Sequence, residues 1–282
     1  MIGLRDLLHA RAATAVPGVH DALSAKIAAR AGHRALYLGG NAMALGLGKG
    51  QPFLTLTETT EITARVARAT DLPVLVDAGA GFGEPAHLDL AVRELELAGA
   101  SGLHIDDQPY PKRAAYHRGQ GSLVAPDLMV TRLAVARGAR RNPDFPIIAR
   151  TDALRVTKSL DETVARCRAY ATAGADALMV LDLGPEQAAV LREACPETPL
   201  IWIGGVTPPV PALARLDAAG FRLACYPFNG FAALSTALAD LWQGLAVTGS
   251  IAQTDETLAT ARADMIDLAD LRRAWEIEDR HG

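Results

Sequence analysis

Two acidic residues of this sequence stand at the ends of short apolar runs. Asp77 follows the run 73–76, and Asp106 follows the run 102–105 after an intervening stretch with helical character. An apolar run, an acid, a loop and an amphipathic helix form the repeating unit of a parallel β/α sheet, whose strand ends meet at one edge. Carboxylates at such an edge suit a hard divalent cation such as Mg²⁺ or Mn²⁺.

Other polar residues follow further apolar runs and would reach the same edge. Arg150 follows the run 146–149, and a guanidinium suits a substrate carboxylate or phosphate. His104 and Asp106 should face the same way, because alternate residues of a strand share a side. Single acids at strand ends are equally common as helix caps and turn residues, so the collective pattern carries the prediction. The expected ring comprises His20, Asp21, Gly39, Gly40, Asn41, Asp77, Asp106, Asp107, Arg150, Thr151, Asp152, Asp182, Gly204, Gly205, Phe228 and Asn229.

Short apolar runs separated by helical patterns account for most of the chain. Several of these helices close on glycine before the next run, where a left-handed conformation turns the chain back into the sheet. Asp21 is expected to cap one helix, and Ser159 with Glu162 has the spacing of a capping box. The pattern predicts an α/β fold, a (β/α)8 TIM barrel, rather than a doubly wound sheet of five or six strands. The expected strands are residues 14–19, 35–38, 73–76, 102–105, 146–149, 177–180, 200–203 and 223–226.

The C-terminal part of the sequence predicts helices beyond the closed barrel. Residues 230–249 give the last barrel helix, and residues 254–279 predict one or two more. We expect a single barrel domain over residues 1–282 with a helical extension from about residue 250. Docking of the extra helices on a neighbouring subunit is a hypothesis.

The composition excludes several classes of protein. The chain has 282 residues, half of them apolar, with a net charge of −4, so it has no general basic surface for nucleic acid. Charged residues interrupt the first 16 positions, and no long uncharged apolar run occurs, so we expect neither a membrane span nor a secretory signal. Cys167, Cys195 and Cys225 lie far apart and are expected to be buried thiols of a cytoplasmic protein.

Six motifs in order carry a resemblance to a known family. VPGVHDALSAKIAARAG, ALYLGG, LPVLVDAGAGFGEP, AGASGLHIDDQPYPKR, IIARTDAL and ACYPFNGF span about residues 16–231. Together they resemble the isocitrate lyase/phosphoenolpyruvate mutase superfamily, in its methylisocitrate-lyase-like and phosphonomutase-like branch. The resemblance implies a barrel whose eighth helix is exchanged with a neighbouring subunit, in a homodimer or homotetramer. It also implies Mg²⁺-assisted making or breaking of C–C or C–P bonds in 2-oxo or 2-hydroxy acids, through a pyruvate-type enolate.

The resemblance assigns substrate-binding roles to residues after two strands. Tyr37, Gly39 and Gly40 match the loop that holds the substrate carboxylate, and Asn41 stands where relatives often have another glycine. Arg150 matches the arginine that holds a substrate carboxylate. Tyr37 and Arg150 are therefore expected to act in catalysis as well as in binding a small-molecule carboxylate.

The resemblance also assigns a metal site, with departures. Asp77 matches an aspartate that binds the metal directly, and Asp106 stands where the family has glutamate. The second acid of the family's D-x-D is Gly79 here, and the acid expected near Gly50 is absent. We therefore expect Mg²⁺ or Mn²⁺ to be bound by a weakened set of ligands.

The lid and the far side of the pocket depart further. Ala114 occupies the position of the cysteine that donates a proton in the true lyases. Tyr116 or His117 could replace it as proton donor, although a tyrosine and a histidine in a loop are more often plain surface residues. GGVTPP replaces an asparagine and a threonine after strand seven, and the glutamate after strand six has at best Asp182 in its place. Substrate identity on this side stays open.

Three functional hypotheses follow. The first is a metal-assisted C–C lyase for a small 2-oxo or 2-hydroxy acid. The second is an oxo-acid decarboxylase, a C–P hydrolase or a phosphonomutase, as relatives without the lid cysteine can be. The third is a barrel that binds a carboxylate without turning it over, which the loss of the acid at Gly79 motivates.

Overall fold

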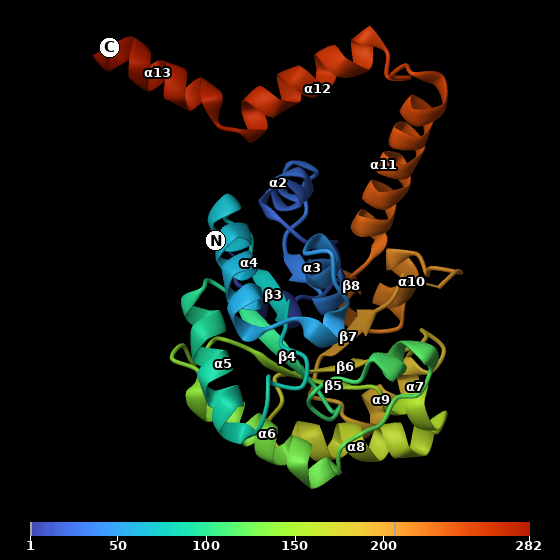
Figure 1. Ribbon diagram of the computed structural model, residues 1–282. Helices are drawn as coiled ribbons and strands as arrows, with labels where there is room; N and C mark the ends of the chain where they lie inside the picture. Colours follow the sequence, from blue (N-terminus) through green and yellow to red (C-terminus); the bar gives the residue numbers. More distant parts are fainter. Residues whose placement is uncertain (1, 206) are drawn as a thin grey trace. The chain divides into compact units, whose positions relative to one another are not determined.

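A closed barrel of parallel strands forms the body of the molecule (Figure 1). The computed structural model describes residues 2–205 and 207–282. Consecutive strands pair with each other, and the last strand pairs with the first, which confirms the predicted (β/α)8 fold. The strands are β1 (Thr14–Val19), β2 (Leu36–Leu38), β3 (Val74–Asp77), β4 (Gly102–Asp106), β5 (Ile147–Thr151), β6 (Ala177–Val180), β7 (Leu200–Ile203) and β8 (Phe221–Tyr226).

The strands lie within two residues of their predicted positions. The largest differences are at β5, which ends at Thr151 instead of residue 149, and at β8, which begins at Phe221 instead of residue 223. Phe221 pairs with Leu200, whereas Leu223 pairs with Ile201, so the register shifts by one residue at this point. Such a bulge has no signature in the apolar pattern, which explains the error at β8.

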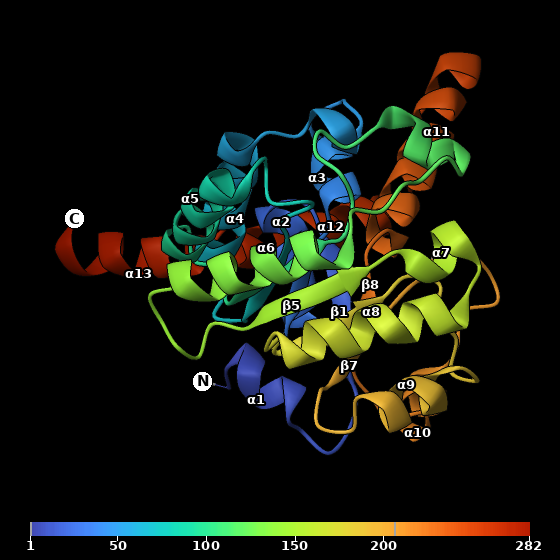
Figure 2. The same ribbon diagram turned by 90° about the horizontal axis from the view of Figure 1, so that it is seen from below.

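Helices alternate with the strands and flank the barrel, and Figure 2 shows α6 and α8 running alongside β5. Asp21 caps its helix as predicted, accepting a hydrogen bond from Ser24 N at 2.7 Å. Ser159 also caps its helix, but the Glu162 side chain binds Arg166 instead of completing the capping box. The helices of this part are α1 (Leu4–Leu8), α2 (Ala22–Arg30), α3 (Gly40–Gly46), α4 (Leu56–Ala69), α5 (Pro85–Leu97), α6 (Pro126–Ala139), α7 (Ala153–Thr157), α8 (Leu160–Thr172), α9 (Ala188–Ala194) and α10 (Leu213–Ala218), with 3₁₀ turns η1 (Gln51–Phe53) and η2 (Ala114–Arg118).

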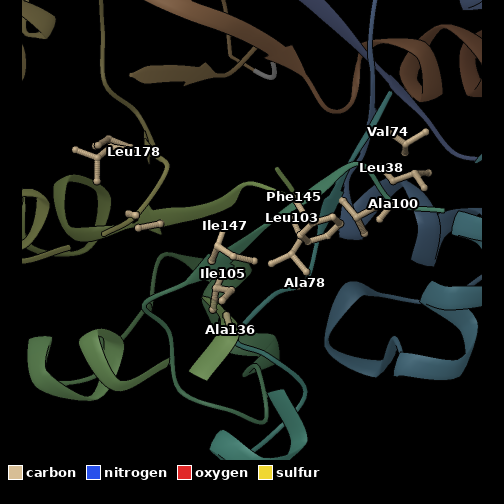
Figure 3. Packing of buried hydrophobic residues seen from close by; sticks show 14 of the residues in the cluster. Leu38, Val74, Ala78, Ala100, Leu103, Ile105, Ala136, Phe145, Ile147 and Leu178 are labelled. Carbon is tan, nitrogen blue, oxygen red and sulfur yellow. The ribbon is translucent and has the colours of Figure 1, made fainter. Parts of the chain in front are cut away.

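The buried apolar side chains form two clusters, one inside the barrel and one between the strands and the helices. Successive residues of a strand belong alternately to the two clusters. Leu103, Ile105 and Ile147 belong to the cluster between strands and helices, where Figure 3 shows them packed together. Leu75 and Ile148 belong to the cluster inside the barrel. Because alternate residues of a strand share a side, the residue two positions after each of these interior side chains also faces inward. At the carboxyl ends of the strands, such residues lie at the mouth of the barrel.

Helix α1 lies at one end of the barrel, and its leucines belong to the interior cluster. Its three leucines, Leu4, Leu7 and Leu8, are at most 2% exposed and pack with Val16 and Ile201. A methyl group on Gly102, the first residue of β4, would lie 2.7 Å from Leu4 Cδ2, so α1 covers the amino end of the strands. The predicted buried cysteines, Cys167, Cys195 and Cys225, are all buried and unbridged.

The chain divides into two compact units, residues 1–230 and residues 231–282. The second contains most of α11 (Asn229–Thr248), together with α12 (Asp255–Leu268) and α13 (Leu271–His281). These helices confirm the expectation of extra C-terminal helices. Their exchange with a neighbouring subunit, and the division into one domain with an extension from about residue 250, stay predictions. Among the described residues, no helix is both long and apolar enough to cross a bilayer.

Replacing Leu7 by alanine should destabilise the barrel, because the side chain is fully buried at the end of the interior cluster. We expect a loss of about 2–5 kcal/mol in the free energy of unfolding, measured by urea denaturation. Leu97→Ala is the matched control, since Leu97 is 63% exposed on α5. Equal losses in the two variants would contradict the closing role of α1.

Candidate active site

Many of the residues predicted at the strand ends line a cavity of about 510 Å³ at the carboxyl end of the barrel. Its lining does not include the predicted residues His20, Asp21, Asp107, Thr151, Asp152 and Asn229. Asp77 and Arg150 line it from the ends of β3 and β5. Asp106 does not belong to this lining but is fully buried close by, within 3.5 Å of Arg150 Nε. The other predicted binding or catalytic residues that line the cavity are Tyr37, Gly39, Gly40, Asn41 and His117.

Asp77, His104 and Asp106 form a buried cluster at the ends of β3 and β4. One ligand atom from each lies within 4.8 Å of the others. His104 Nε2 lies 2.8 Å from Tyr37 Oη, and His104 Nδ1 lies 3.2 Å from Asp106 Oδ1. The cluster forms because all four side chains occupy interior positions of neighbouring strands.

Backbone amides aim the Asp77 carboxylate. Oδ2 accepts hydrogen bonds from Gly40 N at 3.0 Å and Gln51 Nε2 at 3.3 Å, and Oδ1 accepts one from Gly79 N at 2.9 Å. Gly79 has a φ of +52°, a conformation that favours glycine. The residue at the position of the expected second acid therefore orients Asp77 through its amide instead of adding a charge.

Positive side chains surround Asp106. Lys112 Nζ lies 3.4 Å from Oδ2, and Arg150 Nε lies 3.5 Å from Oδ1. Burial alone would raise the pKa of Asp106, but Arg150, Lys112 and His104 outweigh it and hold this pKa well below its usual value. Asp106 therefore keeps its negative charge.

Asp152 connects the barrel wall to the loop after β4. Its carboxylate accepts hydrogen bonds from Arg150 Nε at 2.9 Å and Nη2 at 3.3 Å. Gln108 and the Tyr116 hydroxyl donate to the same carboxylate. This fixes the direction of the Arg150 guanidinium and ties the lid, which we define as residues 109–122, to the end of β5.

A second layer of buried polar contacts supports these residues. Asp107 accepts hydrogen bonds from Thr151 Oγ1 at 2.6 Å, the Asp152 amide at 3.0 Å and Tyr170 Oη at 3.0 Å. Arg132 donates to the backbone carbonyl oxygens of Asp106 and Gln108 at 3.3 Å and 2.8 Å. These contacts fix the backbone at the ends of β4 and β5.

Sequence reasoning missed Gln51, Gln108 and Arg132. Gln108 follows directly after the acidic pair at the end of β4, which was an available signal. Arg132 lies on the buried face of α6 at helical spacing from Met129 and Ala136, and a charged residue on an apolar face requires a partner. No comparable signal marked Gln51, whose position depends on the conformation of its loop.

Tyr116 and His117 bring the lid to the cavity. Their rings meet edge to face, with centroids 5.5 Å apart. Burial and the charge of Asp152 raise the pKa of Tyr116, so its phenol stays protonated. Burial, together with Lys112 and Arg155, lowers the pKa of His117 and favours the neutral imidazole.

Comparison with known proteins agrees with this geometry. The family model described as phosphoenolpyruvate phosphomutase matches residues 4–246. The chain belongs to the isocitrate lyase/phosphoenolpyruvate mutase superfamily. It is 34% identical to 2,3-dimethylmalate lyase of Eubacterium barkeri over 283 residues, covering 99% of this chain and 96% of the relative.

Solved structures of this superfamily share the whole fold. A crystal structure of 2,3-dimethylmalate lyase superposes with a TM-score of 0.86 at 27% identity, covering all of both chains. Phosphonopyruvate hydrolase in complex with oxalate and Mg²⁺ gives a TM-score of 0.88 at 25% identity, covering 99% of this chain and 97% of that one. The relatives support the expectation of a carbon–carbon lyase.

The acidic cluster fits a divalent cation on its own chemistry. Among the described residues, His104 Nδ1 and Asp106 Oδ1 are buried and lie 3.2 Å apart, but neither atom makes a hydrogen bond. Buried polar atoms are rarely left unsatisfied, and carboxylate oxygens with an imidazole nitrogen suit a divalent metal. The predicted metal residues Asp77 and Asp106 thus share a site that can hold a divalent ion, with His104 as a further donor.

Glu58 fixes the loop that carries Gln51. Its carboxylate accepts hydrogen bonds from Lys49 Nζ at 2.5 Å and from Thr55 N at 2.9 Å. The hydrogen bonds from Lys49 and Thr55 lower the pKa of Glu58 from 4.5 to about 2. Lys49, in the loop where the resemblance placed a further acid, is therefore paired with Glu58 at the start of α4.

We expect Glu58→Gln to lower the Tm at pH 7. The difference from the parent protein should shrink as the pH falls from about 4.5 to about 2, because a carboxylate with a depressed pKa stabilises the fold only while it is ionised. Thermal unfolding across this pH range measures the effect. Glu61→Gln on the same helix is the control, and a difference that does not change with pH would contradict the assignment.

Proposed function

We propose that this protein is a divalent-metal-dependent carbon–carbon lyase that acts on a small 2-oxo or 2-hydroxy carboxylic acid. The observation that carries the proposal is the placement of the Asp77–His104–Asp106 cluster beside Arg150 in one cavity. An anion-binding guanidinium next to a cation site suits an acid that chelates a metal through its carboxylate and its neighbouring oxygen. Membership of a family that contains lyases supports the same conclusion.

In this proposal the substrate carboxylate is held by the loop after β2 and by Arg150. Gly39, Gly40 and Asn41 line the cavity where α3 begins. The Gly40 amide already donates to Asp77, so the amides of Gly39 and Asn41 are the ones proposed to meet an anion. Burial raises the pKa of Tyr37, which keeps its phenol protonated beside His104 and able to donate to a substrate oxygen. Tyr37 and Arg150 therefore serve in both binding and catalysis.

Asp77 and Asp106 would hold the metal, which we propose to be Mg²⁺ or Mn²⁺. When bound, the ion supplies Lewis-acid stabilisation of the enolate charge that develops on the oxo acid. We also propose that the ligand set is weakened, because Gly79 supplies no carboxylate and Lys112 and Arg150 already compensate Asp106. The assembly is proposed to be a cytoplasmic homodimer or homotetramer that exchanges a helix between subunits.

Asp77→Ala should abolish divalent-cation binding and lyase activity together, since it removes the carboxylate that Gly40 and Gly79 orient. Mn²⁺ binding can be followed by the loss of the free-ion signal in electron paramagnetic resonance. Asp71→Ala is the control, because Asp71 is exposed just before the same strand. Unchanged Mn²⁺ binding in Asp77→Ala would refute the metal site.

The reaction type is tested with a panel of substrates in the presence of Mg²⁺. Pyruvate release from 2,3-dimethylmalate or 2-methylisocitrate would support the lyase. Pyruvate release from oxaloacetate or phosphonopyruvate alone would favour a decarboxylase or a C–P hydrolase, and conversion of phosphonopyruvate to phosphoenolpyruvate a phosphonomutase; Ala114 at the expected cysteine position motivates this second function. Binding of Mg²⁺ and pyruvate without any turnover would favour a carboxylate-binding protein.

We propose that His117 replaces the missing cysteine in moving the proton. The Tyr116 hydroxyl donates to Asp152, whereas the His117 imidazole lines the same cavity. Its lowered pKa favours the neutral form, so His117 would first take up a proton from solvent and then donate it to the carbanion in place of the cysteine. His117→Gln should lower kcat about 100-fold with little change in KM. Tyr116→Phe keeps the ring and should reduce kcat less, and the opposite ranking of the two variants would assign the proton to Tyr116.

A further inference from the structure

The mouth of the barrel is divided into a polar half and an apolar half. On β2 to β5 the interior positions at the mouth carry Tyr37, Asp77, Asp106 and Arg150. After β6 the equivalent interior position carries Leu181, and at the end of β7 it carries Ile203. Both aliphatic side chains line the cavity and belong to the interior cluster.

The strand geometry shows that Leu181 and Ile203 face inward. Met179 and Leu181 belong to the interior cluster, whereas Leu178 and Val180 belong to the outer one. Ile203 follows the same alternation on β7. Leu181 and Ile203 therefore point into the cavity, where a ligand would lie, and not toward the helices outside the barrel.

Trp202, which lies on β7 and belongs to the outer cluster, adds an aromatic surface to the cavity. Its ring meets that of Tyr226 at 61° with centroids 5.2 Å apart. A methyl group on Gly204 would lie 2.4 Å from Trp202 Cζ2, so the indole packs against the backbone where the loop after β7 begins. The aromatic surface is held in place before any ligand arrives, which reduces the entropic cost of binding.

Charge is nearly absent from this half. Of the described residues that line the cavity from β6 onward, only Asp182 has a charged side chain. Both of its oxygens accept hydrogen bonds from Arg155, at 2.8 Å and 2.6 Å. The Arg155 guanidinium also lines the cavity, but its charge is balanced by Asp182, so this ion pair offers no net positive charge to a second substrate carboxylate.

We propose that the substrate carries an uncharged alkyl or aryl group at the end remote from its 2-oxo or 2-hydroxy acid head. This inference rests on the proposed function, which places the head between Asp77 and Arg150. The remote group then lies against Leu181, Ile203 and Trp202. A carboxylate there would lose its hydration without gaining a partner, whereas each buried methylene adds affinity.

The test is isothermal titration calorimetry with the full chain in Mg²⁺. The ligands are pyruvate, 2-oxobutanoate, 2-oxopentanoate and a matched pair: 2-oxoglutarate and 5-methyl-2-oxohexanoate, in which an isopropyl group replaces the remote carboxylate. We expect affinity to rise about fourfold per added methylene. The isopropyl member should bind at least about tenfold more tightly than the diacid.

Leu181→Lys should reverse the preference within the matched pair, because it places a cation in the apolar half. Leu90→Lys is the control on an exposed leucine of α5 and should leave the preference unchanged. If Leu181→Lys does not fold, the parent protein alone decides through the matched pair. Tighter binding of 2-oxoglutarate than of 5-methyl-2-oxohexanoate would overturn the inference.

The two levels of the proposal fail differently. If pyruvate and the longer acids all bind and Asp77→Ala weakens them together, the head site stands and the matched pair judges the remote group. If no 2-oxo acid binds in the presence of Mg²⁺, the proposed function itself is contradicted, and the inference with it.

Discussion

The burial of Arg150 constrains the whole barrel mouth. The residue is only 6% exposed, and a buried charge is tolerated only beside compensating groups. Asp152 grips it through paired hydrogen bonds, and Asp106 lies within 3.5 Å. Burial alone would lower the pKa of Arg150, but these carboxylates raise it well above its usual value, so the charge persists.

The carboxylate that balances the charge of Arg150 also holds the neighbouring loop after β4 in place. Asp152 also binds Gln108 and Tyr116, so the same carboxylate that orients Arg150 holds the lid. Asp107 binds Thr151 and the Asp152 amide, and Arg166 compensates Asp107 at 3.3 Å. The ends of β4 and β5 are thus joined by hydrogen bonds whose partners lie 44 or 45 positions apart in the chain.

The sequence predicted those features that local rules control. Asp77 and Arg150 were found because each follows an apolar run, and a parallel barrel collects strand ends at one mouth. Asp106 was predicted as a metal residue from the same rule, but its proximity to Lys112 depends on the path of the lid, which no local pattern encodes. Gln51 escaped for the same reason: its reach to Asp77 is decided by a loop conformation. The β8 bulge depends on pairing with β7, which the local pattern does not encode. The capping box at Ser159 is broken by a competing local contact, because Glu162 binds Arg166 four residues further along α8.

The leucines of α1 have a kinetic consequence. With the amino end of the strands covered, the cavity communicates with solvent through the mouth at the carboxyl end. A reaction that divides one molecule into two fragments must then release both through the same opening. The fragment nearer the opening departs first, and the one chelated at depth departs last. The fragment that leaves last should therefore be a competitive inhibitor with respect to substrate, whereas the fragment that leaves first should not.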